Sequence, residues 1–250
     1  MSGPRRIGEV SFWYRDMGGA PAERPSLDGD CTADVCIVGA GYTGLWTAYY
    51  LKKADPSLNV VIVERNFAGF GASGRNGGWL TGGFAWNHGR YLKDSSESAV
   101  RAMVGAMNAT VAEVLRVTEA EGIEADILPT DELMVATNPA QLIRMKEETV
   151  HRRHWGEEDR VFEISAEEAN ARVRVPGTLG GMLVKGVARI QPAKLVRGLA
   201  AVVEKLGVRI AEGTTVTGLG KGEVTTDRGI TRAPIILRCT EGFTTTIPGE

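Results

Sequence analysis

The feature that most constrains the fold of this chain is a glycine-rich turn at residues 39–44, with the sequence GAGYTG. An apolar run precedes it at residues 34–38 and another follows at residues 59–63, and both runs are typical of buried strands. The stretch between them carries apolar residues at helical spacing and ends near an Asp-Pro pair. We therefore predict a strand–helix–strand unit over residues 34–64, with parallel strands and a right-handed crossover.

Each part of this unit suits the binding of a dinucleotide. Gly39 permits the tight turn, Gly41 lets the backbone approach a pyrophosphate, and Gly44 lets the helix pack closely on the strand. The phosphates would then meet the amide groups and the positive dipole at the N-terminus of the helix.

An acidic residue completes the pattern, because Glu64 ends the second strand twenty residues after Gly44. Its carboxylate can accept hydrogen bonds from both hydroxyls of an adenosine ribose, and its charge would repel a 2′-phosphate. The unit therefore predicts binding of FAD or NAD and disfavours NADP.

A second glycine-rich loop, GFGASGRNGGW at residues 69–79, begins five residues after Glu64. Its backbone amides and the side chains of Ser73, Arg75 and Asn76 suit a pyrophosphate or a flavin ring. A plain NAD domain would normally continue here with its next helix and strand, so the loop favours FAD. A flexible surface linker, the alternative, does not account for the Arg-Asn pair between glycines.

The rest of the chain alternates helical and strand patterns. A long helix over about 94–121 carries an apolar stripe that includes Met103 and Met107, which we predict to be core. The other expected elements are a strand at 133–137, a capped helix over 139–153, a short helix with a capping box at 165–168, a helix over 192–206, and a meander of short strands over 208–239.

Composition excludes several classes of protein. The 250 residues carry a formal net charge of −2, which argues against nucleic acid as the main partner. Three cysteines without a CxxC pair indicate neither a disulfide framework nor structural zinc. His151 and His154 lie one helical turn apart without further ligands nearby, so we predict no metal. The N-terminus has no apolar run of signal-peptide length, and the apolar stretch 35–51 is short and interrupted by glycines. We therefore expect a cytoplasmic protein without a membrane span.

The segments DVCIVGAGYTGLWTAYYLKK, NVVIVER and GFGASGRNGGWLTGG resemble the FAD-dependent oxidoreductases of the D-amino-acid oxidase and glycine oxidase group. The closest likeness is to the branch that contains γ-glutamylputrescine oxidoreductases, which shares an aromatic-bearing lead-in. The closing strand near 235–243 is also similar, with Cys239 in place of the usual alanine. The resemblance and the two loops together imply these cofactor-binding residues: Gly39, Ala40, Gly41, Tyr42, Thr43, Gly44, Glu64, Arg65, Ala72, Ser73, Arg75, Asn76, Gly77, Gly78, Val216, Thr240 and Gly242.

The same resemblance implies an α/β fold, in which a Rossmann-type FAD-binding βαβ domain is interleaved with part of an α+β substrate domain. We expect a lead-in at 1–33, the FAD-binding domain at 34–90 and 186–250, and the partial substrate domain at 91–185. Members of the family run well beyond 250 residues. We therefore expect a fragment or a shortened form that lacks the C-terminal remainder of the family fold.

The implied reaction oxidises the C–N bond of a small-molecule amine or amino acid. A hydride passes to flavin N5, the imine hydrolyses, and O2 or another acceptor takes up the electrons. No catalytic residue is identified, and none is required as a base if the amine binds unprotonated. His88 either lines the site or lies in a solvated loop. Two alternatives stay open: an NAD-dependent dehydrogenase, and a catalytically silent FAD-binding module or subunit.

Overall fold

The computed structural model describes residues 10–83 and 87–250, so the first nine residues of the lead-in and residues 84–86 lie outside the description. The chain divides into two compact units. Unit 1 holds the chain up to Gly77, Glu121–Asp126 and Gln191–Glu250, and unit 2 holds Gly78–Ala120 and Ile127–Ile190. Residues 78–90 and 186–190, which we expected in the FAD-binding domain, thus belong to unit 2, and 121–126 belong to unit 1.

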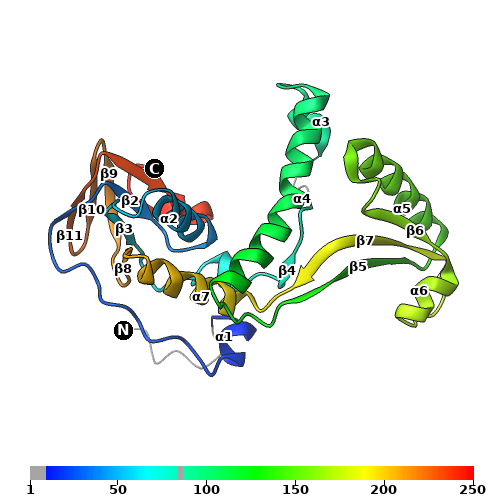
Figure 1. Cartoon of the computed structure of the whole chain (residues 1–250), viewed down its shortest axis with the longest axis horizontal. Helices are drawn as coiled ribbons and strands as arrows, with labels where there is room; N and C mark the ends of the chain where they lie inside the picture. The colour runs from blue at the N-terminus through cyan, green and yellow to red at the C-terminus, as the bar shows by residue number, and fades with distance from the viewer. Residues whose placement is uncertain (1–9, 84–86) are drawn as a thin grey trace. The chain divides into compact units, whose positions relative to one another are not determined.

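The centre of unit 1 is a four-stranded parallel sheet in the order β12-β2-β3-β8 (Figure 1). Its strands are β2 (Val35–Val38), β3 (Val60–Val63), β8 (Arg209–Ala211) and β12 (Ile235–Arg238). The helix α2 (Tyr42–Ala54) connects β2 to the neighbouring β3, and all four residues of each of these two strands are buried. The α/β fold class and the strand–helix–strand unit expected over 34–64 are confirmed.

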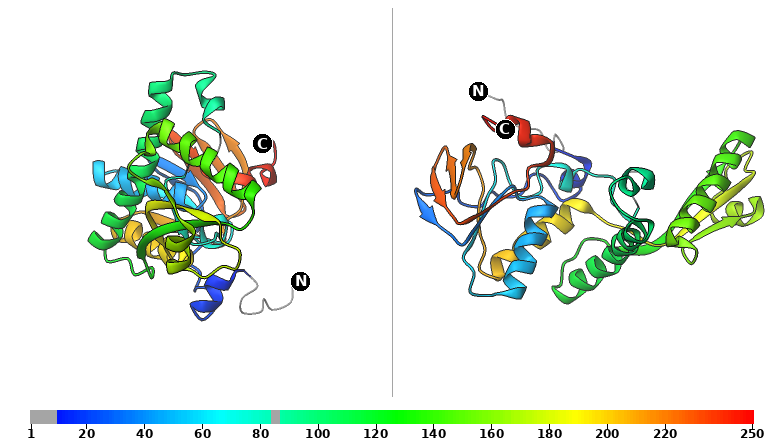
Figure 2. Two further views of the ribbon diagram at one scale, coloured as in Figure 1. Left: turned by 90° about the vertical axis from the view of Figure 1, so that its right-hand side faces the viewer. Right: turned by 90° about the horizontal axis from the view of Figure 1, so that it is seen from above.

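Two layers cover this parallel sheet. The helices α2 and α7 (Pro192–Lys205) pack against each other on one side (Figure 2). On the other side lies a second sheet, in the order β1-β11-β10-β9, made of β1 (Cys31–Thr32), β9 (Val216–Gly220), β10 (Glu223–Thr226) and β11 (Gly229–Arg232). The core between the sheets includes Cys36, Val38, Val61, Val63, Ala211, Val216, Val224 and Ala233.

One expectation for unit 1 needs correction. The strands expected as one meander over 208–239 belong to two sheets, because only β9, β10 and β11 pair antiparallel with one another. The first and last strands, β8 and β12, instead pair parallel with β3 and β2. Both are short, and they pair with the outer edges of the central strands β3 and β2.

The lead-in contains one short helix and one short strand. Residues 12–16 form the short helix α1 (Phe12–Asp16), in which the Ser11 hydroxyl accepts a hydrogen bond from the Tyr14 amide. At the other end of the lead-in, β1 pairs parallel with β11.

Unit 2 is built on an antiparallel sheet centred on β7 (Gly180–Arg189). The strand β5 (Leu128–Ala136) pairs with β7 along the length of β7. The strand β4 (Trp79–Leu80) pairs with the C-terminal end of β7, and β6 (Val161–Ile164) pairs near its N-terminal end. The helices of this unit are α3 (His88–Leu92), α4 (Glu97–Ala120), α5 (Pro139–Arg152) and α6 (Ala166–Arg172), and a π-helical turn, η2 (Arg153–Glu157), follows α5. The Asn138 cap of α5 and the capping box at the start of α6 both form as predicted.

The stripe predicted on the long helix is partly wrong. Val100 and Val111 of α4 are buried, but Met103 is 46% exposed and so is not core. Val104, one residue later on the helix, is buried instead. Among the described residues, no helix is both long and apolar enough to cross a membrane.

Candidate functional site

Unit 1 contains a pocket at the carboxyl ends of the parallel strands, which is where open α/β sheets bind their ligands. Three strand ends meet there, through Val38 of β2, Val63 of β3 and Cys239 directly after β12. The remaining lining residues are Gly39, Ala40, Gly41, Tyr42, Thr43, Glu64, Arg65, Asn66, Gly69, Phe70, Gly71, Ala72, Ser73, Thr214, Thr215, Val216, Thr240, Glu241, Phe243, Thr246 and Ile247.

The turn after β2 requires glycine at its two ends. Gly39 has a φ of +105°, and a Cβ there would lie 2.5 Å from the carbonyl oxygen of Cys239. A Cβ at Gly44 would lie 2.2 Å from the carbonyl oxygen of Gly39. Any side chain at either position would therefore force the turn, β12 and α2 apart.

The third glycine, Gly41, opens the N-terminus of α2 toward the loop that carries Ser73. A Cβ at Gly41 would lie 3.0 Å from the Ser73 hydroxyl oxygen, and that same oxygen accepts a hydrogen bond of 2.8 Å from the Tyr42 amide. The first amides of a helix have no partner within the helix, so this end of α2 presents donors to an anion in the pocket. The hydroxyl of Ser73 can add a further donor. This donor set fits a pyrophosphate.

Glu64 holds its carboxylate against the same turn. One oxygen accepts from the Ala40 amide at 3.0 Å, and the other accepts from the Asn66 amide at 2.9 Å. Burial raises the pKa of this carboxyl above its usual range, although the two amides act in the opposite direction. A carboxylate has about four acceptor positions, so about two remain for the hydroxyls of a ribose.

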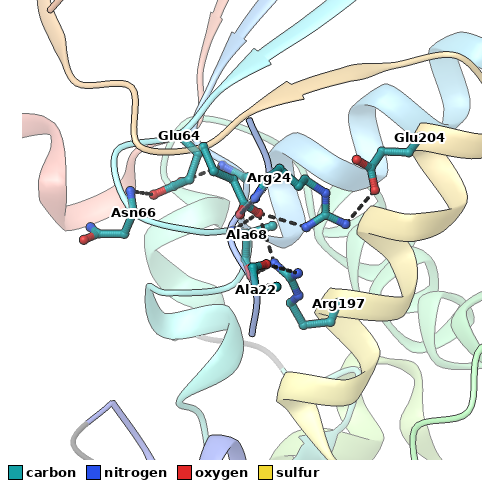
Figure 3. Close-up of polar contacts among 9 residues, drawn as sticks. Ala22, Arg24, Glu64, Asn66, Ala68, Arg197 and Glu204 are labelled. Carbon is teal, nitrogen blue, oxygen red and sulfur yellow. Dashed lines mark hydrogen bonds and ion pairs between the residues drawn. The ribbon is translucent and has the colours of Figure 1, made fainter. Parts of the chain in front are cut away.

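An ion network holds the segment that follows β3 (Figure 3). The side chain of Glu212 is fully buried and accepts hydrogen bonds from the Ala68 amide at 2.8 Å, from Arg24 at 2.8 Å and from Arg197 at 3.0 Å. Arg24 also binds Glu204 at 2.6 Å. Burial opposes the charge of Glu212, but these donors hold the pKa of its carboxyl below the usual value. The network therefore joins the lead-in, α7 and the loop that lines the pocket.

Two cation–aromatic pairs lie at the pocket. The guanidinium of Arg65 lies 5.4 Å from the ring centre of Phe243, and that of Arg75 lies 4.8 Å from the ring centre of Phe70. Cys239 is half-buried, and burial raises the pKa of its thiol, so the thiol stays protonated. The pocket therefore combines donors, the acidic side chains of Glu64 and Glu241, and flat aromatic surfaces.

The structure brings most of the predicted site residues to this pocket but leaves others outside its lining. Gly44, Arg75, Asn76, Gly77, Gly78 and Gly242 do not line it. Sequence reasoning missed Asn66, Phe70, Thr214, Thr246 and Phe243, and two of these carried a signal. Phe70 lies inside the second glycine-rich loop, and Asn66 follows the acidic end of β3.

The three histidines take no part in the pocket. His88 starts α3 in unit 2, where it is buried, stacks on Trp155 at 4.9 Å and lies 3.0 Å from the ring nitrogen of His151. Neither reading offered for His88, a site residue or a solvated loop residue, describes this buried position. His154 packs edge-on against the same Trp155. Among the described residues, no three His, Cys, Asp or Glu side chains gather in a group that could hold a metal ion.

Comparison with known proteins agrees with this geometry. A family model described as DAO, FAD dependent oxidoreductase, matches residues 34–249. Gamma-glutamylputrescine oxidoreductase of Escherichia coli (strain K12) is 31% identical over 209 residues, which is 83% of this chain and 48% of that protein.

Two solved structures show the same fold at low sequence identity. L-amino acid deaminase from Proteus myxofaciens, in complex with anthranilate, has a TM-score of 0.71 at 18% identity, covering 90% of this chain and 50% of that one. Glycine oxidase from Geobacillus kaustophilus has a TM-score of 0.65 at 22% identity, covering 83% of this chain and 55% of that one. The chain spans about half the length of the relatives it matches. The family model covers most of the chain, and the resemblance inferred from the sequence is confirmed. The chain belongs to the DAO family of FAD-dependent oxidoreductases, and its cofactor is FAD.

Proposed function

We propose that this protein oxidises the carbon–nitrogen bond of a small amine or amino acid. The observation that carries the proposal is that residues 39–43 of the turn, Glu64 and Ser73 line one pocket in a chain of this family. The named relative in Escherichia coli supports an amine of the polyamine type, and the solved relatives support amino acids.

Different residues of the chain would bind different parts of FAD. Glu64 would hold the ribose of the adenosine, and the first amides of α2 with Ser73 would hold the pyrophosphate. The backbone at Val216 would meet the adenine, and Ala72 and Thr240, which also line the pocket, would contact other parts of the cofactor. When bound, FAD would supply a hydride acceptor at flavin N5, and O2 or another acceptor would take up the electrons. A substrate amine that binds unprotonated needs no base from the protein, and the imine is hydrolysed after release.

The test uses the purified protein, together with any sequence that follows Glu250 in the reading frame, and a panel of amines. We expect flavin absorbance to accompany the protein and at least one amine or amino acid to bleach it without oxygen. Peroxide on the return of air would indicate an oxidase, and reoxidation by a dye alone would indicate a dehydrogenase. Flavin that no member of the panel reduces would contradict the proposal and favour a silent FAD-binding module. Bound nicotinamide cofactor without flavin would favour the NAD-dependent alternative.

A further inference from the structure

The lead-in helix α1 packs directly against the second glycine-rich loop of unit 1. Tyr14 is only 1% exposed, and its ring meets the ring of Phe67 edge-on at 5.2 Å. Phe70 and Trp13 pack around the same small cluster, together with Ala193 of α7. This cluster is separate from the core between the two sheets of unit 1.

The loop is shaped to receive Tyr14. A Cβ at Gly69 would lie 2.7 Å from the Tyr14 hydroxyl oxygen, and one at Gly74 would lie 2.6 Å from it. Gly69 also has a φ of +86°, which a side chain rarely adopts. Both glycines therefore let the loop close over the tyrosine ring.

Two hydrogen bonds attach α1 to the far end of the loop. The indole nitrogen of Trp13 donates to the carbonyl oxygen of Asn76 at 2.7 Å, and the Ser11 hydroxyl donates to the carbonyl oxygen of Gly74 at 3.1 Å. On its other side, α1 is held by Gln191, whose side-chain nitrogen donates to the Trp13 carbonyl at 2.9 Å. Gln191 is itself buried and caps α7.

The same lead-in reaches the loop a second time through Glu212. The amide and the guanidinium of Arg24 both donate to this carboxylate, which in turn accepts the Ala68 amide directly before Gly69. The Leu27 amide donates to the Thr214 hydroxyl at 3.0 Å, and Thr214 lines the pocket. The lead-in thus contacts both ends of the loop that contains Ser73.

Among the described residues of the lead-in, none lines the pocket itself. We propose that Trp13 and Tyr14 are positioning residues for FAD, which act by holding residues 69–76 so that Ser73 faces the N-terminus of α2. This inference rests on the FAD site described above, but it does not depend on which substrate is oxidised.

The test compares FAD dissociation constants of matched variants, measured by flavin fluorescence well below the melting temperature. Trp13→Phe keeps an aromatic ring and removes the indole donor, so we expect binding to weaken about fivefold, the scale of one neutral hydrogen bond. Tyr14→Leu removes the ring over which the loop closes, so we expect a loss of about tenfold or more. Tyr14→Phe is the matched control. Among the described residues the Tyr14 hydroxyl has no hydrogen-bond partner, so we expect binding within about twofold of the parent.

A second control separates positioning from general stability. Val203→Ala on α7 removes fully buried methyl groups at a position that is not part of the Tyr14 cluster. We expect it to lower the melting temperature without changing FAD affinity or the hydrogen exchange of residues 69–76. That exchange should become faster in Trp13→Phe, even without FAD.

The proposal is overturned if Trp13→Phe and Tyr14→Leu both bind FAD like the parent, or if Val203→Ala weakens binding as much as Tyr14→Leu. A loss of affinity in Tyr14→Phe equal to that in Tyr14→Leu would also overturn it, because the hydroxyl rather than the ring would then carry the effect. The amine panel is not used here, so failure of the proposed reaction leaves this comparison intact.

Discussion

Glu64 occupies an unusual position for a carboxylate, because it is bound by backbone amides on both oxygens and yet lies at the edge of a pocket. The Ala40 amide places one oxygen at the glycine turn, and the Asn66 amide places the other at the start of the following loop. Burial without a cationic hydrogen-bond partner is what raises its pKa. Two hydroxyl donors of a ligand would stabilise the charged form of a carboxylate in such a setting.

We therefore expect Glu64→Gln to weaken FAD binding by roughly 1–3 kcal/mol, or about 5- to 150-fold. The glutamine can still accept from one amide but lacks the charge that strengthens the ribose hydrogen bonds. Titration of the apoprotein with FAD measures this, with Glu223→Gln, on β10 outside the pocket, as the control. An unchanged dissociation constant would place the ribose elsewhere.

A side chain at Gly41 would enter the pocket at the N-terminus of α2. A Cβ at this position already meets Ser73 at 3.0 Å, and a longer side chain would fill the space in front of the α2 amides. We expect Gly41→Leu to abolish FAD binding and Gly41→Ala to weaken it, with normal circular dichroism in both. Gly105→Ala on α4, where a Cβ meets nothing within 4 Å, should bind as the parent does. Stoichiometric flavin in Gly41→Leu would contradict the site assignment.

At the scale of elements, the ion network around Glu212 connects segments that are distant in sequence. The lead-in contributes Arg24, α7 contributes Arg197 and Glu204, and the loop after β3 contributes the Ala68 amide. Glu212 itself follows β8, so one buried carboxylate determines how four segments meet. Buried charges of this kind cost much more when one partner is removed than the intact pair contributes.

We expect Glu212→Gln to lower the free energy of unfolding of unit 1 by about 3–5 kcal/mol, because Arg197 loses the carboxylate that it binds and Arg24 keeps only its contact with the partly exposed Glu204. Glu204→Gln, which removes only the partly exposed contact to Arg24, should cost about 1 kcal/mol or less. Urea denaturation of the two variants measures both values. Equal losses would show that the buried carboxylate has no special role.

The same carboxylate predicts how stability depends on pH. Its pKa is lower in the folded chain than its usual value of 4.5, so folding favours the charged form. The stability that it contributes is fully present above pH 4.5 and is lost as the pH falls through its folded pKa. In Glu212→Gln the acid limb of the stability curve should therefore be shallower than in the parent.

At the scale of the whole molecule, the chain forms two units with separate sheets, and the pocket is lined by unit 1 alone. A ligand that binds only the folded form stabilises it by mass action, by about 2.7 kcal/mol at 100 times its dissociation constant. We expect saturating FAD to raise the melting temperature. We also expect it to slow hydrogen exchange in residues 38–43, 63–73, 214–216 and 239–247. Slower exchange confined to segments outside the pocket would contradict the site.

Local patterns predicted much of this structure because their causes are local. The turn at 39–44, the capped start of α5 and the capping box of α6 depend on residues within a few positions of one another. The acidic end of β3 could be placed for the same reason, since the strand and helix between it and the turn have nearly fixed lengths. Even the second loop was visible, through its glycines and its Arg-Asn pair.

Other features depended on partners far away in the chain. The sequence determined the dinucleotide-binding turn, its helix and its acid, because backbone geometry and capping act over short distances. Only the tertiary structure decided that β8 and β12 belong to the parallel sheet and not to the antiparallel one. It also decided that Met103 is exposed and that His88 is buried against Trp155. The tertiary structure also decided that Tyr14 and Arg24 lie against the second glycine-rich loop and the segment before it. The contact of Arg24 with Glu212, for example, joins residues 188 positions apart. Such contacts follow from which surfaces meet on folding, which no local pattern specifies.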